Sequence, residues 1–170
     1  IALSMCCYFL LVLVMLLEAK LLIPSIVDVV SIVLLCISFF LTYKEKYTMA
    51  VLLSHLGINI WVFVSVIFLG WESGGQQFIT LLLISIFMTS YVKNRIKVEY
   101  AILLVLIHVG LHLYMTMNAP IYGQTFWEML YTHILSIVFA FGTLIAVVVT
   151  FSHNSISRET KLKDYNDNLK

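Results

Sequence analysis

The chain has 170 residues, of which 62% are apolar and only 11% are charged, and its mean hydropathy is +1.03. A soluble globular domain carries about 25% charged residues, so this composition excludes an ordinary soluble domain and a disordered tail. The net charge of +1 provides no field that would attract a polyanion, which excludes a nucleic-acid-binding protein. The composition is that of an integral membrane protein.

Polar residues divide the chain into six apolar segments, and a helix needs about 20 apolar residues to cross a bilayer. The predicted spans are residues 1–17, 22–43, 48–69, 78–92, 98–117 and 126–151. The first segment starts at Ile1 without a Met, so we expect a piece of a longer protein whose first span is shortened. The predicted fold class is an all-α membrane bundle of six transmembrane helices. Residues 1–151 form the transmembrane domain, and residues 152–170 form a cytoplasmic linker or signalling helix.

The basic residues give the predicted orientation. An even number of spans places both termini on the same side of the membrane, and only Lys20 among the ten Lys and Arg residues falls on the other side. Short cytoplasmic loops are enriched in Lys and Arg, so we expect a multi-pass protein of the inner (plasma) membrane with both termini cytoplasmic. Trp71 and Trp127 fall at the opposite, outer ends of the spans, where aromatic residues form an interfacial belt.

The last predicted span leads into a polar segment. Residues 152–170 contain neither Gly nor Pro, so the helix has no breaker as it leaves the membrane. Leu162, Tyr165 and Leu169 have a/d-type spacing, which is typical of a coiled-coil surface; their role in signal transmission is what the resemblance described below implies. The alternative interpretation of this short pattern is a solvated tail.

Ionisable residues inside a membrane are costly and are therefore functional candidates. His108 and His112 are four residues apart on the fifth predicted span, so they share a helix face. His133 lies about 10 Å below the outer surface on the sixth span, at 1.5 Å per residue. His55 lies too far toward the inner side to join them. We predict an outward-opening pocket for a small extracytoplasmic ligand, lined by Asp28, Trp71, Glu72, His108, His112 and His133.

Two alternatives apply to the same histidines. Neutral imidazoles ligate transition metals and haem, so His108, His112 and His133 with Asp28 or Glu72 form a possible metal or haem site. More ordinarily, each His bonds across helices to a Ser, Thr, Asn or carbonyl, and this interpretation is favoured over a metal. No cofactor is assigned to this segment, with haem as the one left open. The chain has no H-E-x-x-H, G-x-S-x-G or Walker A motif, so we assign no catalytic residue.

Three features together suggest a family resemblance. They are the six spans with both ends inside, the outer loop Gly70-Trp-Glu-Ser-Gly74 followed by Gln76-Gln77, and the exit helix from Ser157 to Lys170. In these features the chain resembles the six-helix membrane sensor or anchor domains of bacterial signalling enzymes. Such domains stand N-terminal to a GGDEF diguanylate cyclase or a class III nucleotide cyclase, and similar ones precede histidine kinases.

The resemblance implies a homodimer in the bilayer that regulates a downstream cytoplasmic catalytic domain. A diguanylate cyclase is the favoured partner domain and a class III adenylate cyclase is the next. An outer ligand would then change how the paired exit helices meet. Two other functions stay open from the sequence: a small transporter or channel subunit, and a haem- or metal-binding membrane protein.

Overall fold

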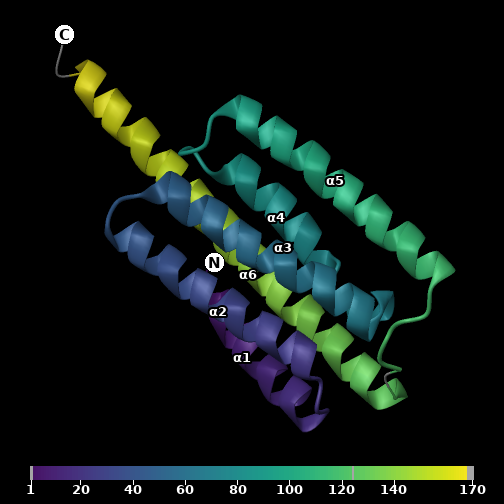
Figure 1. Cartoon of the computed structure of the whole chain (residues 1–170). Helices are drawn as coiled ribbons and strands as arrows, with labels where there is room; N and C mark the ends of the chain where they lie inside the picture. The colour runs from purple at the N-terminus through teal and green to yellow at the C-terminus, as the bar shows by residue number, and fades with distance from the viewer. Residues whose placement is uncertain (1, 124, 168–170) are drawn as a thin grey trace.

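A computed structural model describes residues 2–123 and 125–167, and all secondary structure in these ranges is helical. The chain alternates in direction from one helix to the next, so the connections gather at two ends of an elongated bundle (Figure 1). The elements are α1 (Ala2–Glu18), α2 (Leu22–Tyr43), α3 (Tyr47–Leu69), the 3-10 turn η1 (Trp71–Ser73), α4 (Gln77–Met88), α5 (Asn94–Met117) and α6 (Phe126–Asp167).

Two groups of connections define the two ends of the bundle. Residues 19–21, 70–76, 118–123 and 125 lie at what we call the η1 end. There the backbone N–H of Tyr122 donates to the carbonyl of Phe68 over 2.8 Å. Residues 44–46 and 89–93 lie at the opposite end, which we call the basic end. There Thr48 Oγ1 donates to the carbonyl of Tyr91 over 2.9 Å.

Four helices are long and apolar enough to cross a membrane: α2, α3, α5 and the Phe126–His153 part of α6. The structure thus confirms an all-helical protein of membrane type, while the six-span topology stays a prediction. The described parts of α1 and α4 are shorter apolar helices; α4 has 12 residues and rises only about 18 Å. It ends at Met88, before the predicted boundary at residue 92, because Thr89 takes an extended conformation.

The core lies between α1, α3, α4 and α6 and is aromatic at its centre. The ring of Tyr8 lies with its centroid 4.8 Å from Phe78, 5.3 Å from Trp61 and 5.3 Å from Phe139. Tyr8 and Phe78 are almost completely buried. These rings join four helices that are distant in sequence, which fixes how the bundle packs near the η1 end.

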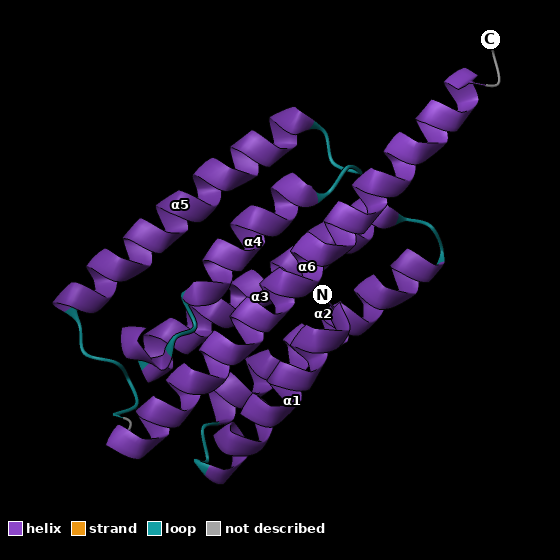
Figure 2. Ribbon diagram, turned by 180° about the vertical axis from the view of Figure 1, so that it is seen from behind, coloured by secondary structure: helices purple, strands orange, loops and turns teal. Residues whose placement is uncertain are grey.

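The α5 helix stands at the side of the bundle (Figures 1 and 2). Only Lys97, Leu104 and Leu111 are buried along its 24 residues, and apolar side chains such as Leu106 are largely exposed. An exposed apolar surface of this kind suits contact with lipid rather than water.

The α6 helix is the longest element. It has 42 residues, which extend about 63 Å at 1.5 Å per residue, and it projects past the other helices at the basic end (Figures 1 and 2). The unbroken helix that the sequence predicts is present as far as Asp167. Leu162 and Tyr165 lie on it, but their side chains, like all of Leu169, are outside the described part, so the pairing surface stays a prediction.

Candidate functional site

The site begins with the tight turn η1, which is held between two glycines. Gly70 has φ of 95° and Gly74 has φ of 86°, in a region that L side chains rarely adopt. A Cβ atom on Gly74 would lie only 2.9 Å from the Cβ of Ser136. Glycine at this position therefore lets the turn make close contact with α6.

Hydrogen bonds connect the η1 turn directly to α6. His133 Nδ1 donates to the carbonyl of Glu72 over 2.9 Å, and Ser136 Oγ donates to the carbonyl of Ser73 over 3.2 Å. Since the Ser136 proton is engaged there, the hydroxyl of Tyr8 donates to Ser136 Oγ, over 2.9 Å. The turn, α1 and α6 are thus joined by a continuous run of hydrogen bonds.

The Trp71 side chain connects the same turn to α5. Its ring centroid lies 5.1 Å from that of His108 and 4.8 Å from that of His112, and both pairs are edge-on. The two histidines therefore share one helix face, as their spacing predicts. Trp71 is half-buried and Glu72 is exposed. We call this group the η1 cluster: Trp71, Glu72, His108, His112 and His133.

The structure brings these five predicted residues to one turn, and it places the sixth, Asp28, among buried side chains of the core. Asp28 is fully buried on α2, with Tyr8 of α1 and Trp61 of α3 among its neighbours. Neither carboxyl oxygen meets hydrogen-bond geometry with any described residue, the nearby Trp61 indole included. Asp28 thus belongs to the helical core, and a ligand-binding role for the η1 cluster stays a prediction.

The described side chains do not fit a metal site. Among the side chains that the structure describes, no three of His, Cys, Asp or Glu approach closely enough to hold an ion. His108 and His112 face the Trp71 ring, and His133 Nδ1 is bonded to a carbonyl. Of these three histidines, His133 has the polar bond that the ordinary interpretation predicts, whereas His108 and His112 make aromatic contacts with Trp71.

Two deeper polar residues follow this pattern of bonds between helices. His55 Nε2 and Ser85 Oγ are 3.0 Å apart and connect α3 to α4. Asn59 Nδ2 donates to the hydroxyl of Tyr100 and connects α3 to α5. Both contacts lie away from the η1 cluster, so His55 and Asn59 hold helices together, which is the common role of polar residues in membrane bundles.

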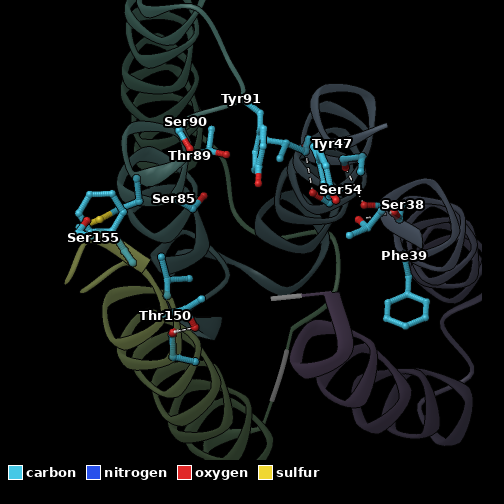
Figure 3. Close-up of a pocket in the computed structure, with 17 residues that line it drawn as sticks. Ser38, Phe39, Tyr47, Ser54, Ser85, Thr89, Ser90, Tyr91, Thr150 and Ser155 are labelled. Carbon is cyan, nitrogen blue, oxygen red and sulfur yellow. Dashed lines mark hydrogen bonds between the residues drawn. The ribbon is translucent and has the colours of Figure 1, made fainter. Parts of the chain in front are cut away.

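A second feature lies at the basic end, where the sequence predicts no site. A cavity of about 560 Å³ opens between α2, α3, α4 and α6 (Figure 3). The described residues of its lining are rich in hydroxyl groups and include no charged side chain; the polar members include Ser38, Tyr47, Ser54, Ser85, Tyr91 and Thr150. We call it the hydroxyl cavity. Ser and Thr in apolar helices usually bond to their own backbone, so the sequence offered no signal that distinguishes a cavity from a packed surface.

Comparisons with known proteins add no relative. No model of a protein family, no curated protein and no solved structure matches the chain. The functional argument therefore depends on the residues and contacts described above.

Proposed function

We propose that this chain is an N-terminal membrane sensor or anchor domain that dimerises and regulates a cytoplasmic nucleotide cyclase. A GGDEF diguanylate cyclase is the favoured catalytic domain, and a class III adenylate cyclase is the next. The support is the resemblance carried by Gly70–Gly74 and the exit helix, together with the contacts of the η1 turn. The basic end would face the cytoplasm, since nine of the ten Lys and Arg residues follow that side of the predicted topology.

One observation carries the proposal: the η1 turn is hydrogen-bonded to the same helix that leaves the bundle. His133 and Ser136 hold the turn, and α6 continues without a break from these residues to Asp167. A helix is stiff over this length, so a small shift or rotation at the η1 end moves its far end. Two catalytic domains carried by paired α6 helices would then change how they meet.

In this proposal, the η1 cluster is the part of the domain that binds the ligand. Trp71, His108 and His112 present aromatic edges and imidazole nitrogens beside the exposed carboxylate of Glu72. These groups suit a small polar ligand that bonds to imidazole and carboxylate. Such a ligand shifts α6 only by its difference in affinity between the two arrangements of the helix.

The first test is the coding sequence that follows Lys170. A GGDEF or class III cyclase domain after a short helical linker supports the proposal, and a stop codon contradicts it. The second test measures cyclic dinucleotide production by the full-length enzyme in cells that lack other diguanylate cyclases. We expect His133→Ala and Trp71→Ala to change output about threefold or more, because each removes a contact of the η1 turn, at about 1 kcal/mol for a hydrogen bond.

Trp127→Ala is the matched control. Trp127 lies at the same end, near the start of α6, but it is 75% exposed and does not belong to the η1 cluster. Its replacement should leave output unchanged. If Trp71→Ala and His133→Ala also leave output unchanged while the protein inserts normally, the sensing role is wrong and the domain is a passive anchor.

A further inference from the structure

The lining of the hydroxyl cavity includes exposed side chains of both α2 and α6, among them Phe39, Thr150 and Phe151. Figure 3 shows Phe39 of α2 and Thr150 of α6 on opposite sides of the cavity. Phe39 is 66% exposed. The cavity therefore opens sideways, between α2 and α6, at the level of the bilayer.

The described lining of the cavity carries no charged side chain, and several of its hydroxyl groups donate to backbone carbonyls. Ser38 Oγ donates to the carbonyl of Ala50, Ser54 Oγ to that of Val51, and Thr150 Oγ1 to that of Ala146. Their protons are thus engaged with the backbone, and the remaining walls include apolar side chains. A charged group would be poorly solvated in such a space. The volume of about 560 Å³ suits an apolar chain, since small-molecule sites enclose roughly 300–1,000 Å³.

The rim of the cavity, in contrast, is basic. Lys44 and Lys46 lie in the short connection between the lining residues Thr42 and Tyr47, and Glu45 is the acidic residue between them. Lys93 follows the lining residue Tyr91 by two positions.

Two contacts hold these connections together. The rings of Tyr47 and Tyr91 stack with centroids 4.5 Å apart, and Thr48 Oγ1 donates to the Tyr91 carbonyl. The two connections thus place three lysines and one glutamate within a few residues of the cavity lining, whose described members are uncharged.

We propose that the hydroxyl cavity binds one anionic phospholipid of the surrounding bilayer. One acyl chain enters between α2 and α6, and the phosphate lies at the rim with Lys44, Lys46 and Lys93. Apolar walls with a basic rim complement an amphiphile whose single charged group lies at the interface, and each lysine near an anionic surface contributes attraction. The bound lipid contacts α6 just before the helix leaves the bundle. This inference concerns lipid binding and does not depend on the proposed cyclase function.

The test is photo-crosslinking in vesicles. The full-length protein is reconstituted in phosphatidylethanolamine with about one-fifth phosphatidylglycerol that carries a diazirine on one acyl chain, and labelled residues are mapped by mass spectrometry. We expect label on Phe39, Met88 and Phe151, which line the cavity, in clear excess over Leu106 on the lipid-facing side of α5. Equal labelling of all lipid-facing residues, or no label in the cavity because another segment of the protein fills it, would overturn the proposal.

Charge variants test the rim. Replacing Lys44, Lys46 and Lys93 together by Gln should reduce cavity labelling about fivefold for each lysine that contacts the lipid. The matching Lys→Arg triple variant should retain labelling, and so should Lys20→Gln at the opposite end. Soluble glycerol phosphate is added as a competitor and should not displace the label. Displacement, or unchanged labelling in the Gln variant, contradicts a lipid site.

A volume variant tests the cavity without altering charge. Ala146→Phe places a ring in the lining, whereas Ile145 is 63% exposed on the same helix and does not line the cavity, so Ile145→Phe is the control. Only Ala146→Phe should lose labelling, by fivefold or more. Both proteins are compared as the monodisperse fraction from gel filtration, so a failure to fold is not counted as a loss of lipid. Equal labelling of the two variants would contradict the proposal.

Discussion

The two ends of this bundle are built in opposite ways. At the η1 end, Gly74 brings a turn against α6, Ser136 receives and donates hydrogen bonds, and aromatic rings fill the space between four helices. At the basic end, α2, α3, α4 and α6 surround a cavity of about 560 Å³. The helix α6 belongs to both ends, so it is fixed at one end and has room at the other.

This difference suggests where movement is possible. Close-packed contacts resist small changes in volume, whereas a cavity leaves side chains without neighbours on one side. A signal that begins at the η1 turn would find α6 firmly held there and more easily displaced near Ala146 and Thr150. The substitutions described below test this difference in packing between the two ends of the bundle.

The largest expected effect is at the η1 turn. Gly74→Ala should lower the free energy of unfolding by about 3 kcal/mol, because a left-handed L residue costs roughly 1–2 kcal/mol and an overpacked contact roughly 1–3 kcal/mol. The new Cβ would lie 2.9 Å from Ser136 Cβ. Unfolding in mixed detergent micelles, followed by tryptophan fluorescence, measures the change.

Gly142→Ala serves as the comparison for that substitution. Gly142 lies within α6, and a Cβ atom there would meet nothing within 4 Å. Alanine should be neutral or raise stability by up to about 1 kcal/mol, through its higher helix propensity. Equal losses at Gly74 and Gly142 would show that the turn does not pack against α6 as described.

Two alanines of α6 compare the two environments along one helix. Ala140 is 6% exposed and belongs to the core, whereas Ala146 lines the hydroxyl cavity. Ala140→Phe should cost roughly 1–3 kcal/mol through overpacking, and Ala146→Phe should stay within about 0.5 kcal/mol of the parent. The same unfolding assay measures the change in stability of both variants. A large loss for Ala146→Phe would mean that the cavity is closed in solution.

The hydrogen bond between Tyr8 and Ser136 should contribute about 1 kcal/mol. A double-mutant cycle with Tyr8→Phe and Ser136→Ala isolates the pair, because Phe keeps the aromatic packing. We expect the double variant to be about 1 kcal/mol more stable than the sum of the single losses predicts. Strict additivity would show that α1 and α6 are not joined through these hydroxyls.

The smallest effect is expected at Asp28. Both of its carboxyl oxygens are buried without a hydrogen-bond partner among the described residues, which costs free energy. Asp28→Asn keeps the shape and removes the ionisable group, so stability should be unchanged or rise by about 1 kcal/mol. A loss of stability in the same assay would instead show that the carboxyl has a binding partner in the folded protein.

The sequence predicted the helices of this protein better than their role in the membrane. Long apolar runs located α2, α3, α5 and the start of α6 within a few residues, because an apolar segment of about 20 residues favours a membrane-spanning helix. The short α4 was overestimated, since the sequence did not show that Thr89 would be extended. Helical spacing also correctly placed His108 and His112 on one face.

The candidate sites also differ in how well the sequence predicted them. The η1 cluster was predicted because its residues are unusual for an apolar chain, and polar exceptions are visible in a sequence. Asp28 was grouped with them by depth alone, and depth does not reveal which side of a helix faces which neighbour. The hydroxyl cavity was missed because Ser38 and Thr150 look like ordinary helix residues until the distances between α2 and α6 are known.

By itself, the sequence determined that this is an apolar helical protein, where its helices turn, and which end carries the positive charge. These properties follow from local polarity, which each segment carries independently of the others. Only the tertiary structure decided that the η1 turn bonds to α6, that Asp28 is enclosed by α1, α2 and α3, and that a cavity opens at the basic end. Those features arise from the angles and distances between helices, which depend on the packing of the whole bundle.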